Sequence, residues 1–218
     1  MKLVYFIHNR TGNKGWGIFK NDYVADLGIL HFEHLLQNNQ ELLEKETISI
    51  SEITLISPIP KPTSLRDAYA FRQHVEAGRK SRGLDMIPEY DKFPVFYYGN
   101  HNAISGPGEI EVEKDQSVKL DYELEIAAVI GKEGKNISVD EADDYIMGYT
   151  IMNDLSARAL QKEEMKLSLG PAKGKDFLTT LGPYIITKDE LEDKLIKGSD
   201  GNRYDLNMKA YLNGDLIS

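Results

Sequence analysis

The side chains of residues 117–131, SVKLDYELEIAAVIG, alternate between a mainly apolar face and a face that begins with charged residues. This alternation is typical of a β-strand with one face against the protein interior. Apolar side chains dominate one face, which is formed by Val118, Leu120, Tyr122, Leu124, Ile126, Ala128 and Ile130. The other face begins with Lys119, Asp121, Glu123 and Glu125 and ends with Ala127 and Val129. Glu123 and Glu125 therefore project from the same face, with Cα atoms about 6.6 Å apart in an extended strand.

Two carboxylates held side by side repel each other unless a proton or a cation lies between them. An oxygen-preferring ion such as Mg2+ or Ca2+ would satisfy Glu123 and Glu125. The alternative is a solvated strand face that happens to carry two glutamates. This stretch alone leaves both interpretations open.

The rest of the pattern predicts further strands and helices. Short apolar or alternating runs predict strands at residues 1–7, 16–23, 53–56, 93–97, 148–152, 182–187 and 206–212. Apolar spacing and capping residues predict helices at residues 28–38, 64–77, 138–147 and 155–165, and a short acidic helix after Thr187. Three prolines within residues 58–62 fit neither kind of element. We therefore expect a small β-rich N-terminal domain at residues 1–60 and a second domain at residues 61–218.

The end of the chain carries a hairpin signal. Asn213-Gly214 follows the predicted strand at residues 206–212, and this dipeptide is typical of a two-residue β-turn. The sequence stops at Ser218, four residues after the turn. This pattern indicates a hairpin that is cut short, so we expect part of the second domain to be missing.

Outside the 117–131 strand, three ionisable side chains are candidates for a catalytic or metal-binding role: Asp67, His74 and Asp154. Asp67 and His74 are seven residues apart, so on the predicted helix 64–77 they would share a face. They are either a helix cap with Ser64 and a satisfied histidine, or an acid and a base that face one cavity. Asp154 would lie between the predicted strand 148–152 and helix 155–165. There it is either a helix N-cap or a third oxygen ligand.

The glycine-rich segment at residues 170–176, GPAKGKD, is not a phosphate-binding loop. Only three residues separate its glycines, and Asp176 follows Lys175 where such a loop requires Ser or Thr. Lys175 is thus either a solvated loop charge or a cation that serves an anionic substrate.

Composition excludes several classes of function. The 218 residues include 26 Lys and Arg against 35 Asp and Glu, which gives a net charge of −9 and argues against nucleic acid or an anionic membrane as a partner. The chain has no cysteine, so disulfides, thiolate metal sites and a cysteine nucleophile are excluded. The apolar run at residues 3–7 is too short for a signal peptide core or a membrane span. These features suit a cytoplasmic protein.

An ordered set of motifs resembles the fumarylacetoacetate hydrolase family. The motifs are RDAYAFRQHV at residues 66–75, PVFYY at 94–98, AISGPG at 103–108, DYELE at 121–125, MNDLSAR at 152–158 and GKDF at 174–177. They cover about residues 60 to 187. The resemblance implies an α+β fold, a mixed β-sandwich roll with peripheral helices, assembled as a homodimer. It also implies a downstream segment to which nothing in this sequence corresponds.

The resemblance further implies roles for individual residues. Glu123, Glu125 and Asp154 would bind a divalent metal ion, with Asp67 as a fourth ligand in the fumarylacetoacetase-like branch. His74 would activate water, and Lys175 would steady the reacting oxygens. The implied substrate contacts are Tyr69, Tyr97 and Gln161. Met165, Tyr98 and Asn100 depart from a tyrosine, a histidine and an arginine of eukaryotic members, which puts the substrate in doubt more than the chemistry.

Three functions remain open at this point. The first is metal-dependent hydrolysis of a C–C bond in a fumarylacetoacetate- or acylpyruvate-like 2-oxo or β-diketo acid. The second is a metal-dependent decarboxylase or isomerase of aromatic catabolism, of the 2-hydroxyhepta-2,4-diene-1,7-dioate type. The third is an inactive, truncated relative that binds metal and ligand without turnover. We expect Mg2+ as the metal, with Ca2+ and Mn2+ as alternatives, because all three accept carboxylate ligands.

Overall fold

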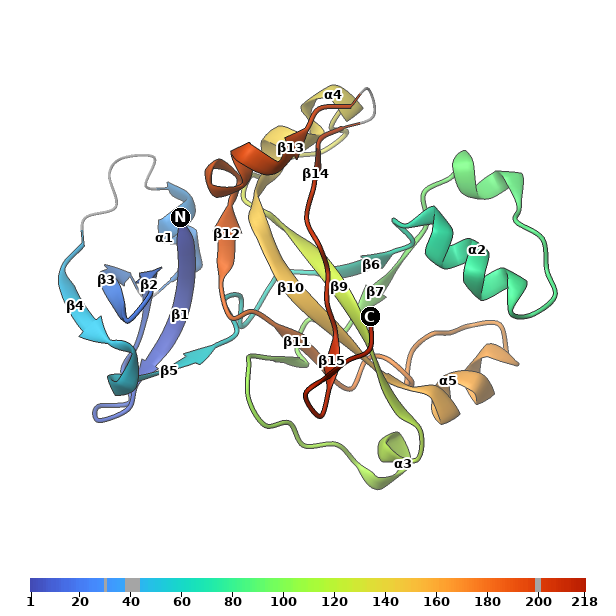
Figure 1. Ribbon diagram of the computed structural model, residues 1–218, viewed down its shortest axis with the longest axis horizontal. Coiled ribbons are helices and arrows are strands. Elements are labelled where there is room, and N and C mark those ends of the chain that lie inside the picture. Colours follow the sequence, from blue (N-terminus) through green and yellow to red (C-terminus); the bar gives the residue numbers. More distant parts are fainter. Residues whose placement is uncertain (30, 38–43, 199–200) are drawn as a thin grey trace.

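A computed structural model of the protein describes residues 1–29, 31–37, 44–198 and 201–218. One sheet dominates it, and helices and short hairpins lie around that sheet (Figure 1). The strands of the large sheet are β1 (Lys2–His8), β2 (Lys14–Lys20), β3 (Tyr23–Ile29), β4 (Glu46–Ser49), β5 (Ile53–Ile56), β8 (Ile104–Ser105), β9 (Leu120–Ile130), β10 (Ile146–Ala157), β11 (Thr179–Leu181) and β12 (Ile185–Thr187).

Within the described residues, three two-stranded pairs and five short α-helices accompany the large sheet. The pairs are β6 (Leu65–Ala68) with β7 (Phe96–Gly99), β13 (Leu195–Ile196) with β14 (Arg203–Tyr204), and β15 (Tyr211–Leu212) with β16 (Asp215–Leu216). The helices are α1 (Phe32–Gln37), α2 (Arg72–Lys80), α3 (Lys114–Ser117), α4 (Val139–Ala142) and α5 (Arg158–Met165). Short 3-10 helices span Ile50–Glu52, Pro88–Asp91, Asp143–Tyr145 and Lys188–Lys194. None of the described helices is long and apolar enough to cross a membrane.

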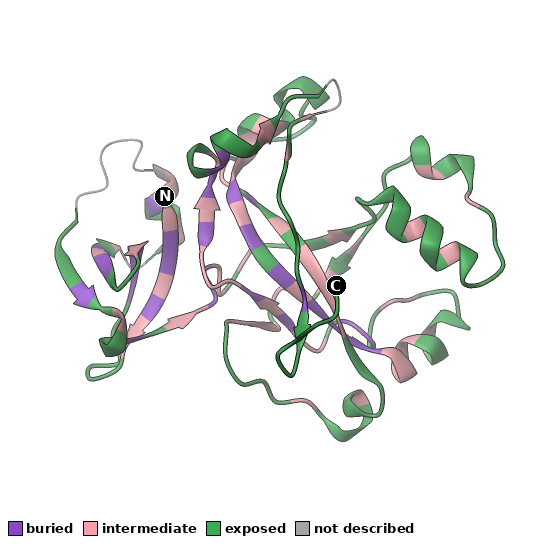
Figure 2. Ribbon diagram, in the orientation of Figure 1, coloured by how far each residue is buried: buried purple, intermediate pink, exposed green. Residues whose placement is uncertain are grey.

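The large sheet joins the N-terminal strands to the centre of the molecule. Its order is β4-β3-β2-β1-β12-β10-β11-β8, with β5 also paired to β1 and β9 paired to β10. One core cluster contains Leu3 and Trp16 from the N-terminal strands together with Val129 and Ile185 from β9 and β12. Burial is concentrated in these strands, whereas the helices are largely exposed (Figure 2). The domain boundary at residue 60 stays a prediction.

Strands β9 and β10 form the longest pairing in the sheet. Their antiparallel register places Glu123 opposite Asp154 and Glu125 opposite Met152. The strand predicted at residues 117–131 is observed over Leu120–Ile130, because Ser117 ends α3 and Val118 caps it, and the face with the two glutamates is the inner one. Val129 on this face is 5% exposed, whereas Ile126 and Ile130 on the opposite face are 42% and 57% exposed. The glutamates therefore do not lie on a freely solvated face.

The helix predicted at residues 64–77 is wrong in its first half. Residues 65–68 form β6, which pairs with β7 in a register that places Asp67 opposite Tyr97. Helix α2 begins only at Arg72, after Phe71 as its N-cap residue. Asp67 and His74 therefore do not share a helix face, and Asp67 is not a helix cap. The competing partner strand lies about thirty residues downstream, so local spacing did not reveal it.

Of the two alternatives for Asp154, the helix N-cap is also wrong. Strand β10 extends to Ala157, so Asp154 lies inside the strand, and Ala157 is the residue before α5. The helix predicted at residues 138–147 is limited to α4 and the following 3-10 turn, because β10 already begins at Ile146. Both errors have one cause. Pairing with β9 extends β10 on both sides of the apolar run at residues 148–152, from which the strand was predicted.

Other predictions are confirmed or need smaller corrections. The strand predicted at residues 16–23 is observed as β2, which ends at Lys20, and a turn at Asn21, with a φ of 58°, leads into strand β3, which was not predicted. Helix α1 covers only part of the predicted helix 28–38, of which residues 30 and 38 lie outside the described residues. The strand predicted at 93–97 is observed at Phe96–Gly99, and residues 182–187 contain β12. At the C-terminal end, Asn213 and Gly214 form the predicted hairpin turn, but its strands are β15 and β16 alone.

Candidate active site

Three carboxylates from three strands converge on one point beside the large sheet. Asp67 of β6, Glu125 of β9 and Asp154 of β10 each place an oxygen within 4.8 Å of the others. Asp154 is 3% exposed, and the other two are half-buried. The β9–β10 register and the β6–β7 pair bring together residues that lie up to 87 positions apart in the chain.

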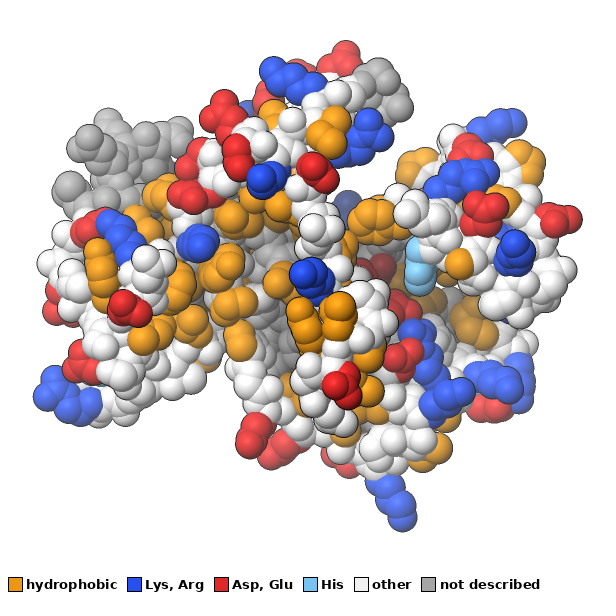
Figure 3. Space-filling view, viewed as in Figure 1, with side chains coloured by type: hydrophobic (Ala, Val, Ile, Leu, Met, Phe, Trp, Pro, Cys, Tyr) orange, Lys and Arg blue, Asp and Glu red, His pale blue; other side chains and the backbone are white. Residues whose placement is uncertain are grey.

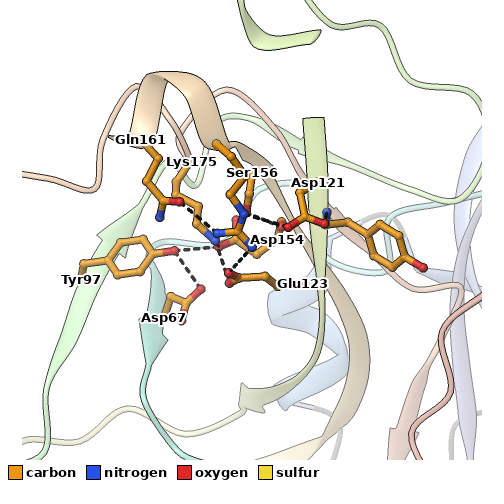
Figure 4. Close-up of polar contacts among 10 residues, drawn as sticks. Asp67, Tyr97, Asp121, Glu123, Asp154, Ser156, Gln161 and Lys175 are labelled. Atoms are coloured by element: carbon orange, nitrogen blue, oxygen red, sulfur yellow. Dashed lines mark hydrogen bonds and ion pairs between the residues drawn. The ribbon is translucent and has the colours of Figure 1, made fainter. Parts of the chain in front are cut away.

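Tyr97 connects two members of this cluster (Figure 4). Its hydroxyl oxygen lies 2.9 Å from Asp67 Oδ2 and 2.8 Å from Asp154 Oδ2. A phenol has one proton, so Tyr97 donates to only one of the two carboxylates at a time. Burial and the charges of Asp154 and Asp67 raise the pKa of Tyr97, which keeps the hydroxyl protonated.

Two carboxylates of the cluster have shifted pKa values, because they are partly buried and lie close to other carboxylates. Burial raises the pKa of Glu125 to about 8, and the charges of Asp67 and Asp154 add to the effect. Burial also raises the pKa of Asp67 to about 6, although the hydrogen bond from Tyr97 acts in the opposite direction. Burial and mutual repulsion disfavour the ionised form of these carboxylates, and a divalent cation bound between them would neutralise their charge. Carboxylate oxygens are also the ligands that Mg2+ and Ca2+ prefer. The residues therefore fit a divalent metal ion.

Lys175 provides a positive charge at the edge of the cluster. It is 5% exposed, and its Nζ donates to Asp154 Oδ2 at 2.5 Å and to Glu123 Oε2 at 2.7 Å. Burial lowers the pKa of Lys175, but the hydrogen bonds with Asp154 and Glu123 outweigh burial and raise it. Lys175 is therefore a charged ammonium inside the site and not a solvated loop residue.

Arg158, at the start of α5, holds the other side of Glu123. Its Nη2 donates to Glu123 Oε1 at 2.8 Å, its Nε to Asp121 Oδ2 at 2.8 Å, and its Nη1 to Gln161 Oε1 at 2.9 Å. Burial raises the pKa of Glu123, but Lys175 and Arg158 lower it below its ordinary value. Glu123 is thus ionised and bonded through both oxygens, whereas the three clustered carboxylates face one another.

The orientation of the Gln161 amide follows from Arg158. A guanidinium carries only donors, so the atom of Gln161 that faces it must be the carbonyl oxygen. The amide nitrogen is then turned to the side of Tyr97, as Figure 4 shows. Gln161 accordingly directs its N–H donors away from Arg158.

The loop that carries Lys175 is fixed by Glu164 of α5. Its carboxylate accepts hydrogen bonds from the main-chain N–H groups of Lys173 at 2.5 Å and Gly174 at 2.9 Å. Gly174 also accepts a hydrogen bond from Ala157 N–H at 2.8 Å, which ties the loop to the end of β10. Position 174 has no room for a side chain, because a Cβ there would lie 2.7 Å from Gln161 Cβ.

His74 and Tyr69 lie outside the carboxylate cluster. Both are exposed, and both line a hollow of about 390 Å³ under α2. Within the described part of the chain, no hydrogen bond joins His74 to Asp67. The structure thus gathers seven of the nine predicted site residues: Asp67, Tyr97, Glu123, Glu125, Asp154, Gln161 and Lys175.

Sequence reasoning missed Asp121, Arg158 and Glu164 as parts of the site. Arg158 follows Asp154 by four residues at the end of an apolar strand, and that position was a signal for a buried cation. Glu164 gave no comparable signal, because its partners are main-chain groups of the loop.

Curated relatives with known names match this chain over most of its length. A fumarylacetoacetase of Arabidopsis thaliana is 36% identical over 180 residues, which cover 73% of this chain and 42% of the relative. The oxaloacetate tautomerase YisK of Bacillus subtilis (strain 168) is 35% identical over 149 residues, which cover 66% of this chain and 46% of the relative. The chain spans about half the length of such relatives.

Solved structures confirm the α+β fold. The fumarylacetoacetate hydrolase of the psychrophilic Exiguobacterium antarcticum superposes with a TM-score of 0.67 at 23% identity, covering 89% of this chain and 69% of that one. A 5-carboxymethyl-2-hydroxymuconate delta-isomerase from Mycobacterium smegmatis gives a TM-score of 0.63 at 25% identity, covering 86% and 67%. Proteins with this fold thus include enzymes named as hydrolases, isomerases and tautomerases.

A family comparison covers the whole second part of the chain. Residues 63–218 match the model described as fumarylacetoacetate (FAA) hydrolase C-terminal. This range includes every residue of the site described above, from Asp67 to Lys175. The chain belongs to the fumarylacetoacetate hydrolase family.

Proposed function

We propose that the protein is a divalent-metal-dependent hydrolase that cleaves a C–C bond in a fumarylacetoacetate- or acylpyruvate-like 2-oxo or β-diketo acid. One observation carries the proposal: Asp67, Glu125 and Asp154 converge from three strands beside the buried ammonium of Lys175. A cluster of carboxylates can hold a metal ion, and the buried ammonium beside it can bind an anionic substrate.

Asp67, Glu125 and Asp154 would hold the metal, and Glu123 would join them as a fourth ligand on release from Lys175 or Arg158. Mg2+ is the ion we propose, because carboxylates with additional water complete its preferred octahedral shell, and Mn2+ and Ca2+ are alternatives. The bound ion would supply Lewis acidity that stabilises the enolate produced by C–C cleavage.

The chain's own groups would position the substrate and move protons. Lys175 and the Gln161 amide would donate hydrogen bonds to the developing oxyanion, where preorganised donors have their largest effect. Tyr97 would orient the substrate from between Asp67 and Asp154. His74 would take a proton from the attacking water, since imidazole is the most common general base in enzymes.

A decarboxylase, isomerase or tautomerase is the alternative function. The relatives named oxaloacetate tautomerase and delta-isomerase favour it, because an enolate intermediate is common to these reactions and to C–C hydrolysis. Product analysis separates the possibilities: hydrolysis releases a carboxylic acid fragment, decarboxylation releases CO2, and isomerisation releases neither.

The test combines metal binding with turnover of an acylpyruvate. We expect Asp154→Asn and Glu125→Gln each to abolish Mn2+ binding, measured by calorimetry, together with turnover. The matched control is Glu111→Gln, because Glu111 is exposed and lies outside the strands that carry these residues. Metal-dependent turnover that persists in Asp154→Asn would refute the proposal.

A further inference from the structure

The hollow under α2 is lined by two of the predicted site residues, Tyr69 and His74, and lies outside the carboxylate cluster. It has a volume of about 390 Å³, and all of its lining residues lie at positions 69–95, in the lobe that carries α2, on the right in Figure 3. Helix α2, the 3-10 helix Pro88–Asp91 and the segment before β7 form its walls. None of the three belongs to the metal cluster.

The hollow and the proposed metal site are formed by neighbouring segments of the chain. Tyr69 and His74 line it, and Tyr69 follows the cluster residue Asp67 by two positions. The hydroxyl of Tyr90 donates to the main-chain oxygen of Tyr69 at 2.9 Å, so the far wall is tied to the strand that carries Asp67. Residues 67–74 therefore join the cluster to the hollow along the chain, and a substrate that reacts at the cluster would extend past His74 into the hollow.

The surface of the hollow is mainly apolar. Val75, Ile87, Phe93 and Val95 contribute aliphatic and aromatic side chains to it. Phe93 is 71% exposed, which leaves a large aromatic face available for a ligand to cover.

Charged side chains on the walls of the hollow limit which ligands can bind there. Arg79 and Arg82 line it, and their Nε atoms donate to the main-chain oxygens of Asp85 at 2.6 Å and Gly78 at 2.9 Å. Glu89 lies on the same walls, so two arginines and one glutamate give the lining one net positive charge. That charge disfavours a cationic ligand, and the apolar side chains supply most of the contact surface.

We propose that this hollow binds the apolar tail of the substrate, and that the tail is an aryl or branched alkyl group about the size of a six-membered ring. The inference rests on the proposed function, because it assumes that the other end of the substrate is a 2-oxo acid held at the cluster. The size is adequate: a cavity of about 150 Å³ holds benzene, and this one, although open to solvent, measures about 390 Å³.

Gly78 offers a direct way to fill the hollow. It lines the hollow from within α2, and a Cβ built on it meets no heavy atom within 4 Å. Gly78→Phe therefore places a ring in the hollow without a clash in the helix. The matched control is Ala77→Phe, which adds the same bulk at the preceding, exposed position that does not line the hollow.

The experiment measures binding of oxamate and of its phenyl derivative oxanilate to the Mn2+-loaded protein by calorimetry. We expect oxanilate to bind at least tenfold more tightly than oxamate, and Gly78→Phe to reduce this ratio to below threefold. Ala77→Phe should keep the tenfold ratio. A second filling variant, Ile87→Trp from the opposite wall, should act as Gly78→Phe does, and circular dichroism verifies that each variant is folded.

The outcomes separate the two proposals. Oxamate that binds without any preference for oxanilate would overturn the tail pocket and leave the proposed function intact. A preference that survives in both Gly78→Phe and Ile87→Trp would do the same. Failure of the Mn2+-loaded protein to bind oxamate at all would overturn the proposed function and the tail pocket together.

Discussion

The Nζ atom of Lys175 lies 2.5 Å from Asp154 Oδ2, and the same atom lies 2.7 Å from Glu123 Oε2. One buried ammonium thus joins two carboxylates that face each other across the β9–β10 pair. Because Asp154 also belongs to the three-carboxylate cluster, the position of Lys175 and the charge of the proposed metal site are coupled.

Lys175→Met should separate the role of this cation from metal binding. We expect turnover to fall at least about 100-fold, because a donor to the oxyanion is lost. The free energy of unfolding without metal should fall by about 3 kcal/mol, because two carboxylates lose a buried partner. Mn2+ binding should persist. Lys173→Met, at an exposed position two residues earlier, is the control, and unchanged turnover in Lys175→Met would contradict the role.

The raised pKa values of Glu125 and Asp67 predict how stability depends on pH in the metal-free protein. Glu125 shifts from 4.5 to about 8 and Asp67 from 3.8 to about 6, so between about pH 4 and 8 the folded state binds more protons than the unfolded state. The free energy of unfolding should therefore be highest below about pH 4 as far as these groups contribute, and should fall as the pH rises to about 8. The limit is about 1.4 kcal/mol for each pKa unit, reduced by the partial exposure of both groups.

Urea denaturation of the EDTA-treated protein at several pH values measures this dependence. Glu125→Gln should flatten the slope between pH 6 and 8, because the amide does not titrate. Added Mn2+ should raise the melting temperature more at pH 8 than at pH 5, since metal binding requires ionised carboxylates. A slope that is identical in Glu125→Gln would show that another group titrates.

Arg158→Lys tests the network around Glu123 and Gln161. Lysine keeps the charge but cannot make the three separate contacts that the guanidinium makes with Asp121, Glu123 and Gln161. We expect kcat to fall about 10- to 100-fold with a smaller change in KM, because Gln161 loses its fixed orientation while Asp67, Glu125 and Asp154 remain in place to hold the metal. Lys162→Arg, on the same helix but outside this network, is the control. A change in KM alone would contradict an orienting role.

The alternating strand around Glu123 and Glu125 could be predicted from the sequence because its signal is local. Side chains two residues apart on one strand share a face wherever the strand lies, so their pairing did not depend on knowing the fold. The motifs around Asp67, Asp154 and Lys175 pointed to the remaining members through the family resemblance. The α+β fold followed from the same resemblance.

The errors occurred where distant strands decide the local conformation. Asp67 lies in β6 because residues 65–68 pair with 96–99, and Asp154 lies inside β10 because β9 pairs with it as far as Ala157. Neither pairing is encoded in the spacing of nearby residues. The contacts of Arg158 and Glu164 were missed for the same reason, since their partners lie on other elements or are main-chain atoms. The roles of His74 and Tyr69 stay predictions.

Gly174→Ala tests whether the position of the Lys175 loop against α5 matters for turnover. A Cβ at position 174 would lie 2.7 Å from Gln161 Cβ and 2.8 Å from its Cα, so either α5 or the loop must shift. Since Glu164 and Ala157 hold Gly174 in place by hydrogen bonds, we expect the strain to lower the free energy of unfolding by about 1–3 kcal/mol. The shift should also move Lys175 and Gln161 apart and lower kcat at least tenfold. Lys173→Ala, in the same loop with an exposed side chain, is the control for loop changes in general. Full turnover in Gly174→Ala would mean that the chemistry tolerates this displacement, and the proposed joint action of Lys175 and Gln161 on one oxyanion would then be wrong.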